Sequence, residues 1–367
     1  MNIGIPKEIK AQECRVSMTP GSVAELVKRG NKVFVERSAG LGASFTDCQY
    51  EAAGAVMVER AAEVFEAAEL IVKVKEPQPS ELALLRPHHL LFTYLHLAAS
   101  KELTEGLLAT GCTGIAYETI EVNRRLPLLE PMSEIAGRMS AIVGSYHLAK
   151  HCGGRGSLLG GVPGVAPGRV VVLGGGTAGV NAARVATGVG ADVTILEVDF
   201  ERMRFLDITM GAAHTVYSNE ANLAEMLPRV DLVIGAVLVP GAKAPKLITR
   251  EMLRMMPQGS VFVDIAVDQG GCAETTRPTT HDHPTYEEEG VIHYCVANMP
   301  GAYARTATQA LNNVTHPWTS LIADRGLAGA CAVRKELVGG INTMAGQLTC
   351  QPVAEAHGLS FAGPAQP

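Results

Sequence analysis

The sequence predicts an α/β protein made of two Rossmann-like, doubly wound lobes with a cleft between them. Short apolar runs of strand length alternate with longer helical patterns, which is typical of parallel sheets covered by helices. The length of 367 residues leaves room for two or three domains. A glycine-rich turn at residues 174–179 joins an apolar strand pattern to a helix pattern, as nucleotide-binding lobes require.

The first lobe is expected over residues 1–128, completed by residues 306–367. The segment from Ala307 onward begins with a helical pattern and is too short for a further domain, so we expect it to pack back on this lobe. Strand patterns lie at Lys32–Glu36, Leu70–Lys75 and Leu90–Thr93, and helix patterns at Gly21–Arg29 and Ser100–Thr110.

The second lobe is expected over residues 129–305. A loop dense in Gly and Pro, Cys152–Gly168, separates its first helix from the strands. That helix is predicted over Ser133–His151, with an apolar stripe of Ile135, Met139, Ile142, Val143 and Tyr146. Five strand patterns then suggest a complete doubly wound domain: Arg169–Leu173, Asp192–Leu196, Leu232–Ala236, Val261–Ile265 and Ile292–Cys295.

The composition excludes several classes of partner. Lys and Arg number 31 against 37 Asp and Glu, so the net charge of −6 gives no basic surface for nucleic acid or anionic lipid. The apolar run at 232–242 is far shorter than the roughly 20 residues of a membrane helix. No secretory signal precedes the first strand, so we expect a cytoplasmic protein. The eight cysteines lack metal-ligand spacing, and the His281–His283 run reads as a solvated loop, so no metal site is expected.

The turn at 174–179 has the pattern of a dinucleotide-binding site. Gly174 permits the tight turn, Gly176 lets a pyrophosphate approach the backbone, and Gly179 lets the helix pack closely on the strand. The helix N-terminus that follows supplies N–H groups and a positive dipole for the phosphates. A glycine-rich turn without a ligand is the structural alternative.

An acidic residue ends the second strand of this lobe. Glu197 is placed to accept hydrogen bonds from the adenosine ribose hydroxyls and to repel a 2′-phosphate, which favours NAD over NADP. Arg202 and Arg204 argue in the opposite direction, because either guanidinium is suited to a 2′-phosphate.

Four ionisable residues follow predicted strands and are candidates for chemistry, because ligands of open α/β sheets bind beyond the carboxyl ends of the strands. Arg15 and Lys75 are suited to hold a small carboxylate, while His96 and Asp268 are suited to move protons. Each has a structural alternative: Arg15 as a surface charge, Lys75 on a wet strand face beside Lys73, His96 as a core histidine, and Asp268 as a turn former before a Gly pair.

Segments across essentially the whole chain resemble the alanine dehydrogenases. They are GIPKEIKAQECRVSMTP, VLGGGTAGVNAARVATGVGADVTILE, AVLVPGAKAP, VDIAVDQGGCAETTRPTTHDHPTY and YCVANMPGAYARTATQALNN. The first two match signature regions that this family shares with the transhydrogenase α subunit. The resemblance implies that L-alanine is oxidised to pyruvate and ammonium with NAD in an intracellular homohexamer, with the first lobe binding substrate and the second binding NAD.

The resemblance also implies residue roles. Arg15 and Lys75 bind the substrate, and His96 and Asp268 form the catalytic pair. The implied cofactor contacts are Ser133, Thr177, Ala178, Glu197, Arg202, Asn219, Val237, Leu238, Arg277, Asn298 and Met299.

The sequence departs from the family pattern at several places. Glu197 replaces the usual aspartate and carries its charge one methylene further out, which bears on the choice of cofactor. The other departures are Ala11, Gln12, Ser17 and the pair Tyr303 and Ala304. Three other functions stay open: an opine- or saccharopine-type dehydrogenase, a nucleotide-binding subunit like that of transhydrogenase, and an NAD-sensing or structural relative without turnover.

Overall fold

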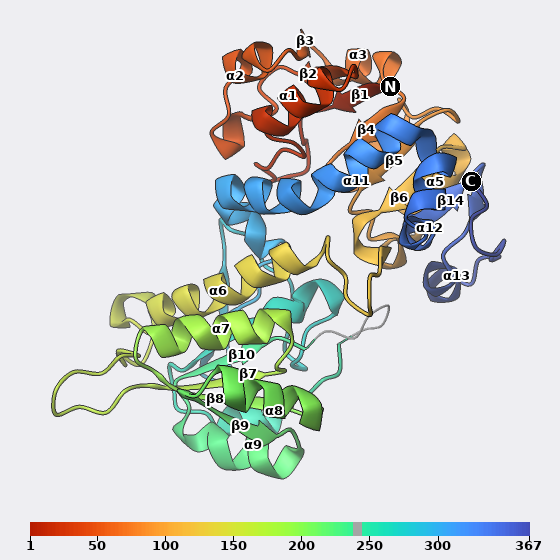
Figure 1. The fold of residues 1–367 in the computed structure, drawn as a ribbon. Helices are drawn as coiled ribbons and strands as arrows, with labels where there is room; N and C mark the ends of the chain where they lie inside the picture. The colour runs from red at the N-terminus through yellow and green to blue at the C-terminus, as the bar shows by residue number, and fades with distance from the viewer. Residues whose placement is uncertain (238–243) are drawn as a thin grey trace. The chain divides into compact units, whose positions relative to one another are not determined.

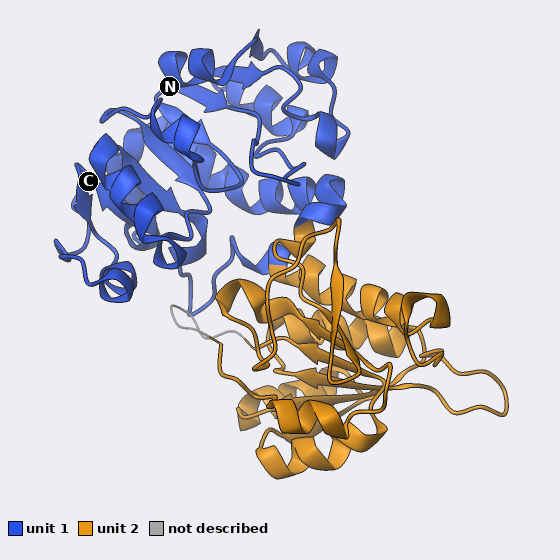
Figure 2. Ribbon diagram, turned by 180° about the vertical axis from the view of Figure 1, so that it is seen from behind, with its two compact units in different colours: residues 1–132, 301–367 blue, residues 133–300 orange. Residues whose placement is uncertain are grey.

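The computed structural model describes residues 1–237 and 244–367. The chain divides into two compact units, which Figure 2 shows in different colours. Unit 1 comprises Met1–Met132 with Gly301–Pro367, and unit 2 comprises Ser133–Pro300. The boundaries lie a few residues from the expected ones at 128 and 305.

Unit 1 is built on an eight-stranded sheet in the order β15-β14-β6-β5-β4-β1-β2-β3. The strands from β6 to β3 run parallel, while β14 and β15 are antiparallel additions. The strands are β1 (Asn2–Ile5), β2 (Lys32–Glu36), β3 (Val56–Val58), β4 (Leu70–Val72), β5 (Leu90–Thr93), β6 (Thr113–Ala116), β14 (Ile341–Met344) and β15 (Gln347–Leu348).

One strand of unit 1 is shorter than expected. The pattern at Leu70–Lys75 predicted a strand to Lys75, but β4 ends at Val72. Beyond that point the N–H of Val74 donates to a carboxylate oxygen of Glu8 at 2.6 Å instead of to a neighbouring strand. A charged side chain therefore ends the strand where the candidate residues begin.

The C-terminal segment completes unit 1, as expected. The side chains of Thr308 and Asn312 in α11 (Ala304–Val333) accept backbone N–H bonds from Val16 and Thr19. A kink at Gly326 divides this long helix. The other helices are α1 (Pro20–Lys28), α2 (Asp47–Ala52), α3 (Ala61–Ala67), α4 (Pro79–Leu82), α5 (Lys101–Thr110), α12 (Glu336–Gly340) and α13 (Gln351–His357).

Unit 2 is the expected doubly wound lobe. Its described strands form one sheet in the order β12-β13-β11-β10-β7-β8-β9, parallel except for the edge strand β12. Two of these strands were not expected, β9 (Ala213–Tyr217) and β12 (Thr285–Glu288). The others are β7 (Arg169–Leu173), β8 (Asp192–Glu197), β10 (Leu232–Gly235), β11 (Val261–Asp264) and β13 (Val291–Tyr294).

Helices cover both faces of the sheet of unit 2, because successive side chains of each strand point to opposite faces. In β7, Val170 and Val172 pack in one core cluster while Val171 and Leu173 pack in another. The helices are α6 (Glu130–His147), α7 (Thr177–Gly188), α8 (Phe200–Thr209), α9 (Glu220–Met226) and α10 (Arg250–Met255).

The apolar stripe predicted on the first helix of unit 2 is wrong in part. Ile142 and Tyr146 are 50% and 59% exposed. The helix instead packs through small residues: a Cβ on Gly137 would stand 2.1 Å from the carbonyl oxygen of Ala178. Figure 1 shows α6 lying along α7, and this close approach explains why glycine rather than a large apolar residue lines the contact.

Both units share one strand order. Counted from its first strand, the parallel part of each sheet runs 3-2-1-4-5-6, so the order reverses between β1 and β4 in unit 1 and between β7 and β10 in unit 2. Such switch points are where open α/β sheets bind ligands. Over residues 1–237 and 244–367, no helix is both long and apolar enough to cross a membrane, and no group of three or more His, Cys, Asp or Glu side chains is placed to hold a metal ion.

Candidate active site

In unit 1 the predicted residues follow strands that lie side by side. Arg15 follows β1, Lys75 follows β4 and His96 follows β5, and these strands are parallel neighbours. The carboxyl ends of parallel strands meet at one edge of a sheet. The fold therefore brings three of the four predicted chemical residues to the same edge, beside the switch point.

The guanidinium of Arg15 is buried and held by a carboxylate two residues earlier. Its side chain is only 2% exposed, so the surface-charge alternative is wrong. Nε donates to Oε1 of Glu13 at 2.6 Å and Nη2 donates to Oε2 at 2.5 Å. Burial alone would lower the pKa of Arg15, but the hydrogen bonds to Glu13 and the negative charge of that carboxylate outweigh the effect of burial and raise the pKa. Arg15 is thus a charged fork whose plane is fixed by Glu13.

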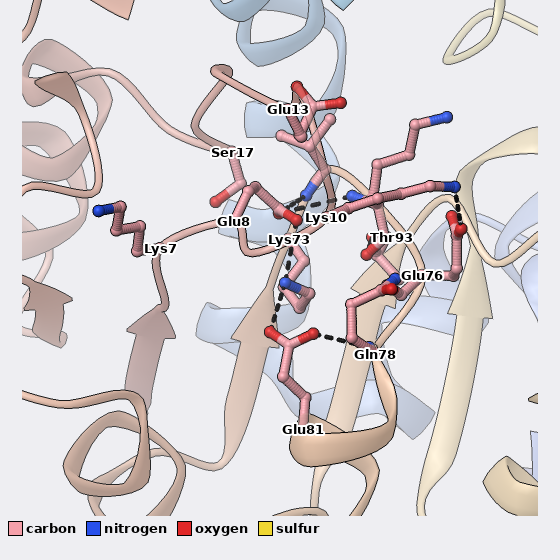
Figure 3. A network of polar contacts seen from close by, with 12 residues as sticks. Lys7, Glu8, Lys10, Glu13, Ser17, Lys73, Glu76, Gln78, Glu81 and Thr93 are labelled. Atoms are coloured by element: carbon pink, nitrogen blue, oxygen red, sulfur yellow. Dashed lines mark hydrogen bonds and ion pairs between the residues drawn. The ribbon is translucent and has the colours of Figure 1, made fainter. Parts of the chain in front are cut away.

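Lys75 stands at the end of a buried network of charges. It is 8% exposed, and Lys73 is fully buried, so the wet-strand alternative is wrong. Figure 3 shows Lys73 between two carboxylates, with Nζ 3.0 Å from Oε2 of Glu8 and 2.7 Å from Oε1 of Glu81. Burial alone would lower the pKa of Lys73, but the two carboxylates raise it.

The same network fixes the backbone around Lys75. The other oxygen of Glu8 accepts the N–H of Val74, and the hydroxyl of Thr93 donates to the carbonyl of Lys75 at 2.9 Å. The segment after β4 is therefore tied to the N-terminal loop on one side and to β5 on the other.

His96 has an unusual backbone that a second carboxylate holds in place. Its φ of 49° lies in the left-handed region, which costs free energy for a residue other than glycine. Oε1 of Glu118 accepts the N–H of His96 at 2.6 Å and that of Leu95 at 3.1 Å. The side chain is 39% exposed, so the core-histidine alternative is wrong. The imidazole Nδ1 lies 3.6 Å from Oε2 of Glu76, an ion-pair distance rather than a hydrogen-bond distance.

In unit 2 the glycine-rich turn has the geometry that a dinucleotide site needs. Gly174 has a φ of 93°, and a Cβ on Gly179 would stand 1.9 Å from the carbonyl oxygen of Gly174. A Cβ on Gly176 would meet no atom within 4 Å, so the turn is open just before α7 begins at Thr177. Strand, turn and helix N-terminus therefore form a cradle for an anionic group.

Glu197 ends β8 and contacts this turn directly. Its Oε2 accepts the N–H of Gly175 at 2.8 Å, and its Oε1 accepts the N–H of Val198 at 2.7 Å. Nε of Arg202 donates to the carbonyl of Gly175 at 2.6 Å, so the acid and the guanidinium bond the N–H and the carbonyl of the same residue. Glu197 was predicted to favour NAD, and Arg202 was predicted to suit the 2′-phosphate of NADP. Both residues therefore lie where the structure would distinguish the two cofactors.

Most of the other predicted cofactor residues lie at the same edge of this sheet. Asn219 follows β9 and caps α9, Val237 follows β10, and Asn298 and Met299 follow β13. Arg277 stacks over the ring of Tyr286 on β12, with its guanidinium carbon 3.9 Å from the ring centre. Ser133 and Ala178 lie on α6 and in the first turn of α7, while Leu238 falls outside the described residues.

Asp268 lies on the short helix Ile265–Gln269 that follows β11. Its Oδ2 accepts the N–H of Asn298 at 3.4 Å, which joins it to a predicted cofactor contact. A left-handed turn does follow at Gly270, so the turn-forming alternative stays open. His96 and Asp268 belong to different units, and their pairing stays a prediction.

Sequence reasoning missed the carboxylates that support these residues. Glu13 and Glu118 hold Arg15 and His96 in unit 1. In unit 2, Asp264 holds the loop that carries Asp268. The buried Asp264 accepts bonds from Cys272 N–H at 2.7 Å and from the Thr276 hydroxyl at 2.6 Å, which closes the loop that carries Asp268. Burial raises the pKa of Asp264, although these bonds oppose the shift.

Two doubly wound units, one with a dinucleotide turn and one with a buried arginine, a lysine and a histidine at its sheet edge, define a dehydrogenase of the α/β class. A family model for the alanine dehydrogenase/PNT N-terminal domain matches residues 4–136, and the model for its C-terminal domain matches residues 140–351. The chain belongs to the alanine dehydrogenase/PNT family.

Individual relatives agree with this assignment along the full length. The chain is 53% identical to the alanine dehydrogenase of Methanococcus maripaludis and 54% identical to that of Halomonas elongata, with 98% of each chain covered in both cases. A solved structure titled L-alanine dehydrogenase superposes with a TM-score of 0.93 at 51% identity, covering 97% of this chain and 99% of that one. A transhydrogenase structure from Sinorhizobium meliloti gives a TM-score of 0.83 at 26% identity, covering 95% and 100%.

Proposed function

We propose that this chain is an L-alanine dehydrogenase, which converts L-alanine, NAD⁺ and water to pyruvate, ammonium, NADH and a proton. The observation that carries the proposal is similarity above 50% identity to alanine dehydrogenases over both units, rather than over the nucleotide-binding unit alone. The transhydrogenase structure also matches both units, but at 26% identity, about half the identity to the alanine dehydrogenases.

The residues of unit 2 fit NAD. The open cradle at Gly176 and the N-terminus of α7 suit a pyrophosphate, and Glu197 beside Gly175 suits a ribose with free hydroxyls. The cofactor contacts proposed here are Ser133, Gly174, Gly176, Thr177, Ala178, Gly179, Glu197, Arg202, Asn219, Val237, Leu238, Arg277, Asn298 and Met299. When bound, NAD⁺ supplies the acceptor for the hydride that leaves Cα of alanine.

The residues of unit 1 bind the amino acid and move protons. Arg15 and Lys75 hold the carboxylate, because a fixed fork and an ammonium both complement it. His96 takes a proton from the water that attacks the imino carbon and passes it to the nitrogen of the carbinolamine. The C–N bond then breaks as the carbinolamine hydroxyl loses its proton to form the carbonyl of pyruvate, and the departing ammonia takes up that proton to become ammonium. Asp268 assists by balancing the charge of the imidazolium. Glu13, Glu8 and Glu118 keep these groups in position through the bonds described above.

The family resemblance carries finer expectations about assembly and location. We infer a homohexamer in the cytoplasm with small-molecule substrates only. Light scattering on the purified chain tests the assembly, with a mass near six times 38.7 kDa expected.

The decisive experiment is an assay of NADH oxidation with pyruvate and ammonium. We expect turnover that needs both substrates and that falls strongly when NADPH replaces NADH. Reactions without ammonium, and with lysine plus 2-oxoglutarate in place of pyruvate plus ammonium, are the controls. Turnover only with the second pair would favour a saccharopine-type enzyme, and NADH binding without turnover would favour a transhydrogenase-like or NAD-sensing protein.

A further inference from the structure

The carboxylate of Glu76 contacts three parts of the candidate active site at once. It follows Lys75 directly in the chain. Its Oε1 pairs with Nζ of Lys10, on the loop that carries Arg15, and its Oε2 lies 3.6 Å from Nδ1 of His96. Figure 3 shows Glu76 at the side of the charge network, with a lysine ammonium reaching its carboxylate. No role was predicted for Glu76 or Lys10.

One oxygen of the Glu76 carboxylate, Oε2, is buried and has no hydrogen-bond partner among the described residues. A buried carboxylate oxygen in that state is unfavourable, and the group at ion-pair distance is the imidazole of His96. Burial alone would raise the pKa of Glu76, but His96 and Lys10 lower it to about 2, so the group is charged at neutral pH.

We propose that Glu76 is a positioning residue for His96, and that Lys10 limits its strength by sharing the same carboxylate. Glu76 holds the proton on Nδ1, so that Nε2 faces the substrate and takes up and releases the catalytic proton. A contraction of about 0.6 Å makes the contact a hydrogen bond, and such bonds are often long before substrate binds. The inference rests on the proposed function, since it assigns His96 a part in turnover.

Other charged or titratable groups of unit 1 also face His96 or its backbone. Glu118 accepts its backbone N–H, and the ring of Tyr94, whose pKa is raised by burial, lies 5.7 Å from the imidazole between centroids. Nε2 of His357, from α13, contacts the carbonyl of Leu97. None of these groups is altered when Glu76 or Lys10 is replaced. A change in the titration of His96 in either variant therefore measures the effect of the Glu76–Lys10 ion pair.

The pair predicts effects of opposite sign on the basicity of His96. In Glu76→Gln the imidazolium loses a neighbouring negative charge, so the acid limb of the pH profile of kcat/KM for alanine oxidation should move down by about one pH unit. In Lys10→Met the carboxylate of Glu76 no longer pairs with an ammonium, so its negative charge stabilises the imidazolium of His96 more strongly. The acid limb should then move up by a few tenths of a pH unit, on the order of a third of the shift expected for Glu76→Gln. Glu76→Asp should recover part of the wild-type midpoint.

Two controls separate this electrostatic effect from general damage. Lys7→Met removes one positive charge from the same loop, at a side chain that points away from the network in Figure 3. Glu121→Gln makes the same carboxylate-to-amide change at an exposed site. Neither should move the acid limb. A variant with a wild-type circular dichroism spectrum and melting temperature counts as folded.

A second readout does not depend on turnover. The titration of His96 in ¹³C-histidine-labelled protein, with its resonance assigned by loss in His96→Asn, should show the same two shifts. An inactive wild type would overturn the proposed function while leaving this titration to decide the inference. An unchanged midpoint in Glu76→Gln, or shifts of the same sign in both variants, would overturn the inference even if the enzyme is active.

Discussion

The two units share a strand order but build their candidate sites from different parts of the chain. At the edge of unit 1 the proposed functional groups are side chains, Arg15, Lys75 and His96, and a buried or partly buried carboxylate holds each of these residues or the backbone beside it. At the edge of unit 2 the central part is the backbone of residues 174–179. The comparison shows that the topology determines where a site lies. The residues that follow each strand determine whether that site is built from charged side chains or from backbone groups.

The largest expected effect separates chemistry from cofactor binding. His96→Ala should lower kcat by about 10² to 10⁴, because it removes the group that we propose moves protons. NADH affinity, measured by calorimetry on the same variant, should stay within about twofold of wild type, because the predicted cofactor contacts, from Ser133 to Met299, all belong to unit 2. Asp268→Asn should lower kcat as well, and little change in ribose recognition is expected, because Asp268 follows β11 and Glu197 ends β8, with β10 and β7 between them in the sheet.

An equal fall in turnover and NADH affinity in His96→Ala would contradict the assignment of chemistry to unit 1 and cofactor binding to unit 2. Glu121→Gln provides the matched control, because its exposed side chain belongs to unit 1 and has no assigned role. It should leave both quantities unchanged.

The next effect concerns the stability of unit 1. Lys73→Met leaves the carboxylates of Glu8 and Glu81 buried without their shared cation, which should lower the free energy of unfolding by about 3–5 kcal/mol. The single tryptophan, Trp318, lies in α11 of unit 1, so its fluorescence in urea reports the unfolding of this unit. Lys7→Met, which removes an exposed charge, should change the midpoint little. A midpoint for Lys73→Met as high as that of the control would mean that the buried charges add no stability.

Lys73 also shows what the sequence could and could not predict. The α/β class, most strands and the glycine turn follow from local patterns, because side-chain periodicity and glycine spacing are properties of neighbouring residues. The partners of Lys73 lie 65 and 8 residues away in the chain, and only the fold brings Glu8 to it. Two lysines in an otherwise apolar run, residues 70–75, were nonetheless a usable signal, because a buried lysine needs an acid.

The residue roles themselves were less accessible to prediction. A strand end can be inferred from a pattern, but the left-handed backbone of His96 and the hold of Glu118 on it depend on the neighbouring strand β6. The stripe on α6 failed for a related reason: the pattern gives the face of a helix, but the close contact of Gly137 with Ala178 is set by tertiary packing.

A smaller effect tests the backbone cradle of unit 2. Gly179→Ala places a methyl group against the carbonyl oxygen of Gly174, so α7 must move away from the strand and the turn must widen. NADH affinity should fall about tenfold or more, about 1.4 kcal/mol at tenfold. Gly188→Ala is the matched control, because its Cβ would meet no atom within 4 Å. If both variants bound NADH equally, the close approach of helix and strand would not be what forms the cradle.

The smallest expected effect is a pH dependence of stability that belongs to unit 1. The pKa of Glu76 is lowered from 4.5 to about 2 in the folded protein, so its contribution is fully present above pH 4.5 and is lost as the pH falls toward 2. Because Lys10 is partly exposed and solvent screens the pair, we expect about 1 kcal/mol. The difference in unfolding free energy between wild type and Glu76→Gln, followed by Trp318 fluorescence, should therefore shrink by about half of this amount between pH 5 and pH 3, and by most of the rest toward pH 2. A difference that stays constant across that range would show that Glu76 stabilises unit 1 through packing alone, and it would also contradict the charge coupling between Glu76 and His96, because such a coupling is reciprocal.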